Sequence, residues 1–432
     1  MKEDVLPEGW ELKKLGDLIF SIVGGGTPSK KNPSFYKGDI PWITVKDLIK
    51  EQLTESVDHI SLDAVTESST RIIPAGTPII AVRMSLGKIA TAQFDTAINQ
   101  DLKAIFLNEH INKDYFIYWY RSIINIIHEL SSGTTVKGIR LENLKSLNVP
   151  LPSLPEQQYL SQKLTALLDE VAQTKQRLEA LLALLKQFRQ SVLADAVSGR
   201  LTEEWRKVQK FPITWQSKRI ADLGKIFSGK TPSKLNASYW NNGNIYWVSA
   251  KDMKSDEIVS SRDLITENAV KETKLKICPK ETILMVMRSG IISHSFPVAI
   301  TNVEVAINQD LKALLPRTDL VIPKFVFYLL KGNERKILDS CSKSGTTVAS
   351  IEMPLFEKFE FRIPSIEEQT QIVQKVETYF ALADEIETQV KAVLENVNLL
   401  TQSILAKAFS GELSAAWRKE NSQLIQIRNN NE

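Results

Sequence analysis

The sequence predicts an α+β protein with two mixed domains, each followed by one long helix. Two observations predict this fold. The chain repeats itself once, with the same short motifs in the same order in both halves. Each half also closes with a long segment in which apolar residues recur every three or four positions, as in a coiled coil.

Four motifs carry the internal repeat. The segment 97–104 reads AINQDLKA and recurs without change at 306–313, which is a shift of 306 − 97 = 209 residues. A period of this length is far longer than a solenoid unit and indicates a duplicated domain pair. The other three motifs are Thr27–Lys30 with Thr231–Lys234, Trp42 and Lys46-Asp47 with Trp247 and Lys251-Asp252, and Ser132–Val136 with Ser344–Val348.

Each mixed domain is expected to contain short strands followed by one aromatic-rich helix. Apolar runs such as Pro78–Val82 and Ile283–Met287 are bounded by turn-forming residues, which is typical of strands. The aromatic-rich segments near 113–130 and 323–339 are predicted to be helical.

The two long helices have predicted start and stop signals. Ser153–Glu156 and Ser365–Glu368 fit the Ser-x-x-Glu capping box, and Gly199 and Gly411 follow the last apolar positions. The apolar stripe of each helix packs either on its own domain or on the other helix, and the matching length and phase of the stripes favour the second arrangement. The stripes are Leu160, Leu164, Leu167, Val171, Thr174, Leu178, Leu181, Leu185, Phe188 and Val192, and Ile372, Val376, Tyr379, Ala383, Ile386, Val390, Val393, Val397, Leu400 and Ile404.

These signals divide the chain into five segments. The polar residues 200–214 are interpreted as a linker, and the polar C-terminal residues are expected to be disordered. The predicted segments are a first domain at 1–152, a first helix at 153–199, a linker with the second domain at 200–364, a second helix at 365–411, and a tail at 412–432.

Composition excludes several classes of protein. Two cysteines, Cys278 and Cys341, cannot form a disulfide framework, and the four histidines have no metal-ligand spacing. The net charge of +3 is compatible with DNA binding but does not by itself argue for it. No signal peptide is evident and no apolar run reaches the roughly 18 residues of a membrane helix, so a cytoplasmic location is expected.

The tandem plan resembles the specificity subunits of type I restriction–modification systems. The resemblance rests on the two related domains, on Pro-x-x-x-Glu-Gln at 152–157 and 364–369, and on Ser-Gly-x-Leu at 198–201 and 410–413. It implies two target-recognition domains on an antiparallel coiled coil, with an internal pseudo-two-fold repeat.

Function follows from the same resemblance as an expectation. Each domain would read one half of a bipartite, asymmetric site in double-stranded DNA. The chain would dock two DNA adenine methyltransferase subunits, and motor–nuclease restriction subunits would join them. No cofactor is expected on this chain, whereas the partner subunits are expected to use S-adenosylmethionine, ATP and Mg.

Two alternatives remain open. Gly224–Thr231 fits the P-loop pattern of an ATPase, although Ile22–Thr27 of the first half lacks the lysine. A coiled-coil scaffold for other proteins, without sequence-specific DNA binding, is the second. Asn32–Phe35 lacks the second proline of a methyltransferase motif, so the chain is predicted not to be an enzyme.

Polar loop residues are the candidates for DNA contacts, because phosphates are held by basic and hydroxyl side chains and bases are read in the grooves. Features shared by both halves should be scaffold or phosphate contacts, so base readers are expected where the halves differ, as at 83–86 and 288–291. The candidates are Ser29, Lys30, Lys46, Arg83, Thr134, Thr135 and Lys137 in the first half, and Ser233, Lys234, Lys251, Arg288, Thr346 and Thr347 in the second.

Overall fold

The computed structural model describes residues 6–131, 138–209, 215–343 and 348–423. The chain forms two compact units. Unit 1 comprises residues 1–178 and 392–432, and unit 2 comprises residues 179–391. Each unit therefore combines one mixed domain with part of each long helix. The mixed domains are called domain 1, before residue 153, and domain 2, which lies between residues 215 and 364.

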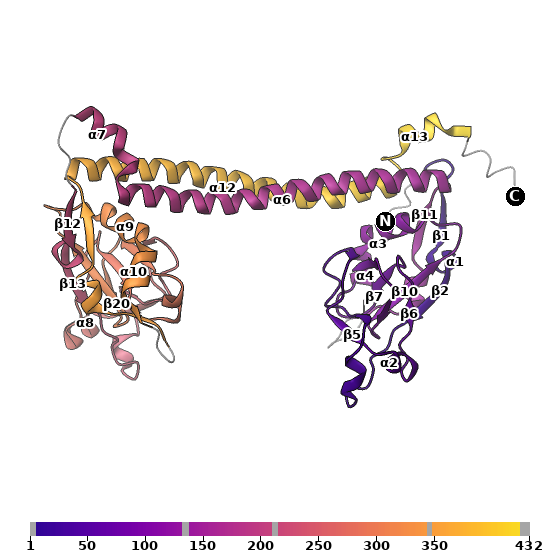
Figure 1. Ribbon diagram of the computed structural model, residues 1–432, viewed down its shortest axis with the longest axis horizontal. Coiled ribbons are helices and arrows are strands. Elements are labelled where there is room, and N and C mark those ends of the chain that lie inside the picture. The colour runs from indigo at the N-terminus through magenta and orange to yellow at the C-terminus, as the bar shows by residue number, and fades with distance from the viewer. Residues whose placement is uncertain (1–5, 132–137, 210–214, 344–347, 424–432) are drawn as a thin grey trace. The chain divides into compact units, whose positions relative to one another are not determined.

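Domain 1 consists of short strands and short helices (Figure 1). Its strands are β1 (Glu11–Lys14), β2 (Ile19–Gly24), β3 (Ile40–Ile43), β4 (Gln52–Leu53), β5 (Asp58–Ile60), β6 (Ile72–Ile73), β7 (Ile79–Ala81), β8 (Ile89–Ala92), β9 (Thr96–Ile98), β10 (Leu102–Leu107) and β11 (Asn148–Leu151). Its helices are α1 (Leu15–Leu18), α2 (Leu62–Thr66), α3 (Lys113–Ser122), α4 (Ile124–Glu129) and α5 (Leu141–Lys145).

Domain 2 repeats this order. Its strands are β12 (Gln216–Arg219), β13 (Gly224–Ser228), β14 (Ile245–Val248), β15 (Glu257–Ile258), β16 (Asp263–Ile265), β17 (Ile283–Val286), β18 (Val298–Thr301), β19 (Val305–Ile307), β20 (Leu311–Pro316), β21 (Ser342–Lys343), β22 (Ser350–Ile351) and β23 (Glu360–Ile363). Its helices are α8 (Glu267–Thr273), α9 (Pro323–Gly332), α10 (Glu334–Cys341) and α11 (Met353–Phe356).

The main sheet is the same in both domains. Its five strands run in the order β2-β10-β7-β8-β4 in domain 1 and β13-β20-β17-β18-β15 in domain 2. The second sheet differs in its last strand, since β5-β3-β9-β6 has four strands and β16-β14-β19 has three. In domain 2 an isolated backbone bridge from Cys278 to Val305 stands where β6 pairs with β9 in domain 1.

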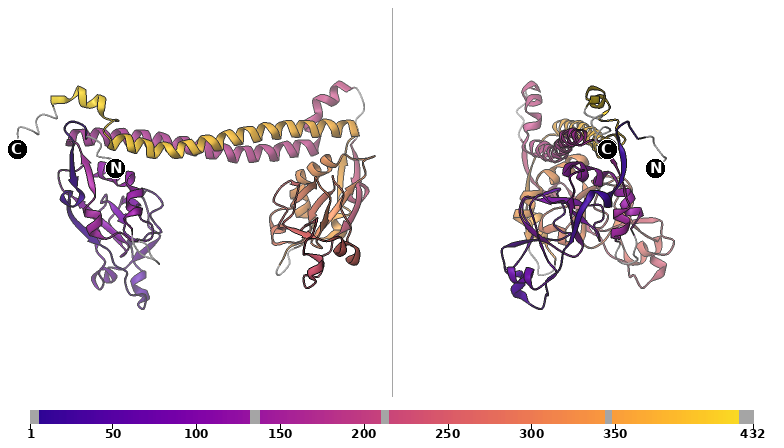
Figure 2. Two further views of the ribbon diagram at one scale, coloured as in Figure 1. Left: turned by 180° about the vertical axis from the view of Figure 1, so that it is seen from behind. Right: turned by 90° about the vertical axis from the view of Figure 1, so that its right-hand side faces the viewer.

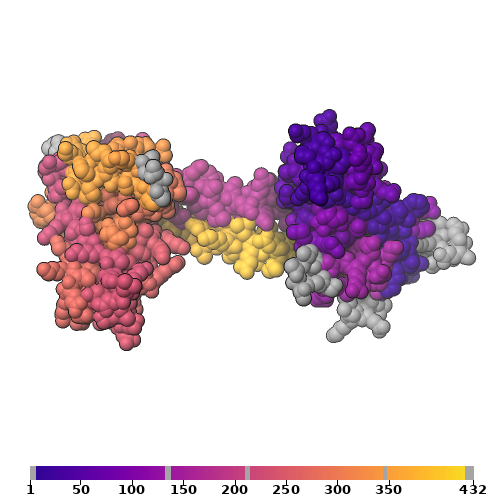
Figure 3. Space-filling model, turned by 90° about the horizontal axis from the view of Figure 1, so that it is seen from below, coloured from indigo at the N-terminus to yellow at the C-terminus, as the bar shows by residue number. Residues whose placement is uncertain are grey.

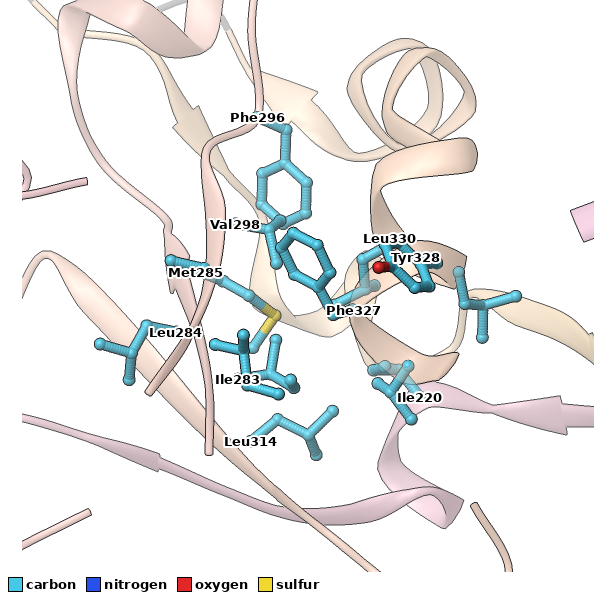
Figure 4. Packing of buried hydrophobic residues seen from close by; sticks show 14 of the residues in the cluster. Ile220, Ile283, Leu284, Met285, Phe296, Val298, Leu314, Phe327, Tyr328 and Leu330 are labelled. Atoms are coloured by element: carbon cyan, nitrogen blue, oxygen red, sulfur yellow. The ribbon is translucent and has the colours of Figure 1, made fainter. Parts of the chain in front are cut away.

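The core of domain 2 lies between the main sheet and α9. All four residues of β17 are buried, which fits a central strand covered on both faces. Figure 4 shows the side chains of α9 facing those of β17 and β18, with Phe327 near Met285 and Val298. In the space-filling view the atoms of each mixed domain are closely packed (Figure 3).

The aromatic-rich segments are helical as predicted, but each forms two helices. The first breaks at Ile123 and the second at Asn333, whose φ of −105° and ψ of 9° lie outside the helical range. The Asn333 amide nitrogen donates to the Leu329 carbonyl at 2.9 Å. This side-chain bond to a carbonyl at the end of α9 replaces a continued helical turn.

The long helices are α6 (Leu154–Ser198) and α12 (Ile366–Phe409), and they lie side by side (Figure 1). In unit 1, Leu160 near the start of α6 shares a core with Leu405 near the end of α12. In unit 2, Val192 near the end of α6 shares a core with Ile372 near the start of α12. The helices are therefore antiparallel, which confirms the expected fold. The stripes also contact their own domains at both ends, so both packing arrangements occur.

The helix ends are only partly as predicted. Gly199 and Gly411 adopt left-handed φ values of 83° and 79°, which confirms the predicted stop signals. The capping boxes do not form in full, because neither glutamate reaches back to its cap, although the Ser365 hydroxyl accepts from the Glu368 amide at 3.4 Å as predicted. The Ser153 hydroxyl is buried without a hydrogen-bond partner, and the Glu156 carboxylate faces the C-terminal segment instead.

The carboxylate of Glu156 forms a buried cluster that we call clasp 1, made of Trp10, Glu156, Ser414 and Arg418. The Glu156 side chain is 1% exposed. Its carboxylate accepts from Trp10 Nε1 at 3.0 Å, Ser414 Oγ at 2.7 Å and Arg418 Nη1 at 2.6 Å. Clasp 1 therefore joins the start of α6 to the segment that follows α12. In Figure 2 that segment lies beside the start of α6 in both views.

Clasp 2 is the equivalent cluster in unit 2. Glu368 is 0% exposed and accepts from Thr202 Oγ1 at 2.7 Å, Trp215 Nε1 at 3.2 Å and Arg206 Nη1. The segments expected to be a linker and a disordered tail thus contain α7 (Glu203–Gln209) and α13 (Ala415–Glu420). Each of these two helices presents the arginine that a buried carboxylate needs.

Candidate nucleic-acid interface

The repeated Asn-Gln-Asp segment forms the centre of the candidate site in each domain. In domain 1 the Asn99 side chain accepts from the Asp101 amide at 3.2 Å and donates to its carboxylate at 3.2 Å. Asn308 and Asp310 make the same two bonds at the same distances in domain 2. These residues brace a turn, which supports their predicted structural role.

Several strands end at this turn. In domain 1, β2 and β7 end beside the start of β10, because both are antiparallel to it. The same holds for β13, β17 and β20 in domain 2. We call this place the repeat edge. It brings together the Thr-Pro-Ser-Lys loop, the Asn-Gln-Asp turn and the loop that begins at Arg83 or Arg288.

The Thr-Pro-Ser-Lys loop is held against the turn by its backbone and by one side chain. A Cβ atom at Gly25 would lie 1.9 Å from the Ile98 carbonyl oxygen, and one at Gly229 would lie 1.8 Å from that of Ile307. Only glycine permits this approach. The Thr27 hydroxyl donates to the Gln100 side chain, and Thr231 donates to Gln309 in the same way.

The Trp-x-x-x-Lys-Asp loop joins the same turn from the second sheet. Trp42 Nε1 donates to the Gly26 carbonyl at 3.2 Å, and the Asn99 amide donates to the Ile43 carbonyl at 3.0 Å. The Asp47 carboxylate accepts two backbone N–H groups at 2.8 Å. All of the repeated motifs in the described ranges therefore surround one turn in each domain.

All of the predicted contact residues in the described ranges are exposed at these loops. Ser29, Lys30, Ser233 and Lys234 follow β2 and β13, and Lys251 follows β14. Lys46 is exposed and lies 3.9 Å from the Asp58 carboxylate. Arg83 and Arg288 are exposed and bridge through their backbones to Gly138 and Ser350. Thr134, Thr135, Lys137, Thr346 and Thr347 lie outside the described residues.

The loops that begin at Arg83 and Arg288 differ between the domains, as expected of base readers. In domain 1 the next residue, Met84, has a φ of 63° and is 68% exposed. In domain 2, Gly290–Ser293 forms a 3-10 turn instead. A left-handed methionine stores strain, which is often found at functional sites. The sequence indicated this divergence but not the strained backbone.

Two lysines of the site were missed by sequence reasoning. Lys103 on β10 and Lys312 on β20 occupy the same position of the identical octapeptide and are half-buried. Lys103 lies over Gly24, and Lys312 donates to the Ser228 hydroxyl. The available signal was the identity of a polar residue within a strand in both halves.

The P-loop interpretation is wrong. The glycine-rich stretch before Gly229 is not a loop, since Gly224–Ser228 forms β13. A short 3-10 turn at Ala237–Tyr239 takes the place of the phosphate-binding helix. The Lys230 ammonium donates to the Thr273 carbonyl at 3.0 Å.

Other kinds of site are absent from the part of the chain that the structure describes. Within those ranges no cluster of histidine, cysteine or acidic residues has the geometry of a metal site. No described helix is long and apolar enough to cross a membrane. Cys278 and Cys341 are free and buried, and burial raises the pKa of Cys278 to about 12. A thiol in this state is a poor nucleophile.

Two related domains with matched scaffolds and unlike exposed loops define a tandem-domain binding protein without a recognisable catalytic centre in its described residues. The model of the type I restriction modification DNA specificity domain matches residues 7–183 and 212–396. The chain therefore belongs to the family of type I restriction–modification specificity subunits.

Individual relatives agree with this assignment. The chain is 30% identical to the type I restriction enzyme StySPI specificity subunit of Salmonella potsdam, over 99% of this chain and 94% of that protein. It is 28% identical to the EcoKI specificity subunit of Escherichia coli over the same shares. The HsdS subunit of Thermoanaerobacter tengcongensis has the same fold, with a TM-score of 0.60 and 19% identity over 94% of this chain and 98% of that one.

Membership of this family settles the general role. The chain is the DNA specificity subunit of a type I restriction–modification complex and is not itself an enzyme. It assembles with DNA and with modification and restriction subunits, which carry out the chemistry.

Proposed function

We propose that the repeat edge of each domain reads one half of a bipartite, asymmetric site in double-stranded DNA. The observation that carries this proposal is the contrast between scaffold and loops. The Asn-Gln-Asp turns have the same hydrogen bonds in both domains, whereas the loops after β7 and β17 have different backbones. Equivalent supports with unlike loops suit two readers of different sequences.

In this proposal, base specificity resides in the unlike loops that begin at Arg83 and Arg288. Met84 is exposed in the loop that begins at Arg83, and contacts with base edges in the grooves specify sequence. Domain 2 keeps the arginine as Arg288 but has Ser289 and Gly290 in place of Met84 and Ser85, so the two edges present different side chains. The exposed Ser29, Lys30, Ser233 and Lys234 hold phosphates, because the same residues at both edges carry no sequence information.

The long helices dock two copies of a DNA adenine methyltransferase subunit, and the motor–nuclease subunits join that assembly. Exposed apolar side chains on the helices support a protein partner there, since a two-helix seam leaves them uncovered. They include Val393, Leu399 and Leu400 in unit 1, and Leu184, Phe188, Tyr379 and Leu382 in unit 2. The partners supply S-adenosylmethionine, ATP and Mg chemistry, and the complex works in the cytoplasm.

The test is co-purification of the chain with its modification subunit, followed by mapping of methylated bases in genomic DNA. We expect two unlike half-sites separated by a fixed gap. Replacing residues 84–86 of domain 1 by glycine and serine should change one half-site and leave the other intact. A single continuous site would contradict the proposal. A replacement of residues 84–86 that alters neither half-site would also contradict it.

The scaffold alternative makes a different prediction. A protein that only holds partners together should give the same methylation pattern with either domain's loops exchanged. The reciprocal replacement of residues 289–291 in domain 2 is the matched control, because it should alter the opposite half-site.

A further inference from the structure

Each repeat edge contains a pair of cations, namely the arginine with which the reading loop begins and a lysine that the reading loop does not explain. In domain 1 the pair is Lys103, on the central part of the main sheet, and Arg83, which follows β7. The backbone places them together, because Lys103 pairs with Ile80 and the Val82 amide donates to the Asp101 carbonyl at 2.9 Å. Burial and the neighbouring Arg83 guanidinium lower the pKa of Lys103.

Domain 2 holds the equivalent pair, Lys312 and Arg288. Lys312 pairs with Met285 on β17, and the amides of Met287 and Arg288 both donate to the Asp310 carbonyl. The two edges thus place a half-buried lysine and an exposed arginine around the same turn, although the loop residues after each arginine differ.

Burial and Arg83 lower the pKa of Lys103 more than the Asp101 carboxylate raises it, so this carboxylate only partly offsets them. Within the described ranges, no salt bridge joins the four side chains of the two pairs to a carboxylate. Two like charges beside a partly desolvated sheet repel each other, and an anion between them relieves that repulsion.

We infer that Lys103 with Arg83, and Lys312 with Arg288, form two equivalent phosphate clamps that hold the DNA backbone at each repeat edge. The inference rests on the proposed DNA reading, and it separates the phosphate contacts of the sheet from the base contacts of the loops. A phosphate is the anion that both edges share, whatever the bases are. An identical lysine under unlike loops is expected only if its ligand is the same in both half-sites.

Lys103 and Lys312 are suited to hold a phosphate because the strands β10 and β20 on which they lie are rigid. A clamp residue on a central strand cannot follow the reading loop when that loop changes sequence. The phosphate position is therefore fixed relative to the sheet, and the divergent loop reaches the bases from that fixed point. The arginine belongs to both parts, since its backbone is anchored to the turn and its side chain begins the reading loop.

The test compares Lys103→Met and Lys312→Met in the complex of this chain with its modification subunits. The probes are a labelled duplex carrying the mapped site and a duplex of equal length with both half-sites scrambled. Each variant should bind both duplexes about 10-fold more weakly at low salt. The slope of log affinity against log salt should decrease by about 0.9 for each lysine removed.

Matched variants separate charge from packing. Methionine keeps the apolar stem over Gly24 or Ser228, and Lys103→Arg should restore most of the affinity. Lys225→Met removes an exposed lysine from the other end of β13 and should leave the salt slope unchanged. Thermal unfolding of each variant reports whether the sheet is intact.

Each outcome has a distinct meaning. A changed methylation sequence in Lys103→Met would overturn the clamp, because a phosphate contact cannot alter base preference in this way. Unchanged affinity and salt slope would also overturn it, as would loss of the modification subunit from the complex. If the unmodified complex failed to prefer the mapped site, the proposed reading itself would fail, whatever the lysines do.

Discussion

Removal of Arg418 tests whether the segment after α12 is a structural part of unit 1. Its guanidinium is the only cation that the structure places on the buried Glu156 carboxylate within the described ranges, and its second nitrogen donates to the Gly411 carbonyl at 2.6 Å. Arg418→Ala leaves that carboxylate with Trp10 and Ser414 as donors. The start of α6 then carries a buried charge without a counter-charge.

The expected loss of stability in Arg418→Ala follows from the burial of the Glu156–Arg418 ion pair. The Glu156 side chain is 1% exposed and that of Arg418 is 13% exposed, so solvent screening is small. Breaking a buried pair by removing one partner costs about 3–5 kcal/mol. The two remaining donors place the expected loss near the lower limit, at about 3 kcal/mol, or about 100-fold in the opening equilibrium.

Hydrogen exchange with mass spectrometry is the suitable assay, because it reports each unit separately. Amides in the first turns of α6 should exchange about 100-fold faster in Arg418→Ala, while those at the start of α12 should not change. Arg206→Ala is the matched variant and should produce the opposite pattern through Glu368. Glu156→Gln combined with Arg418→Met should restore part of the protection, since no buried charge remains.

Exchange at the start of α6 that is indistinguishable from that of the unaltered chain would refute this reasoning. It would mean that Glu156 reaches solvent or becomes protonated at little cost. The segment after α12 would then be a dispensable tail, as the polar character of its sequence suggests.

Three further predictions concern the repeat edge and its surroundings. Gly229→Ala should unfold the edge of domain 2 and abolish methylation at one half-site, because its Cβ would lie 1.8 Å from the Ile307 carbonyl oxygen; intact methylation would contradict this. Lys230→Ala should leave ATP binding to the isolated chain at the background level of the unaltered chain in a calorimetric titration, since this lysine is bonded to Thr273. Cys278 should resist alkylation at pH 8 in the native chain and react after denaturation, as mass spectrometry can show, because its pKa is raised to about 12 by burial.

Periodicity and repetition were sufficient to predict the helices and the duplicated domains. The stop glycines were predictable for a similar reason, since a glycine just after a long apolar stripe can adopt the left-handed conformation that ends a helix. The glutamates at the helix starts were misread. Their spacing from serine fits a local capping box, and only the fold shows that an arginine more than two hundred residues away competes for Glu156.

The candidate site, too, was predicted from the sequence only in part. Comparison of the two halves identified the motifs around the Asn-Gln-Asp turn and the divergence after Arg83. It did not identify Lys103, because a lysine inside an apolar strand pattern has no local signal of function. The neighbouring arginine becomes visible only when β7 and β10 are paired.

By itself, the sequence determined the order of the elements, the internal repeat and the family to which the chain belongs. These are properties of residue type and spacing along the chain, which short-range physics governs. The tertiary structure decided the antiparallel packing of α6 and α12, the partners of Glu156 and Glu368, and the pairing of cations at each repeat edge. Such contacts depend on which distant segments fold together. The spacing of the apolar stripes favoured packing of one helix on the other, but it does not fix the direction of the pair or the partners of a buried side chain.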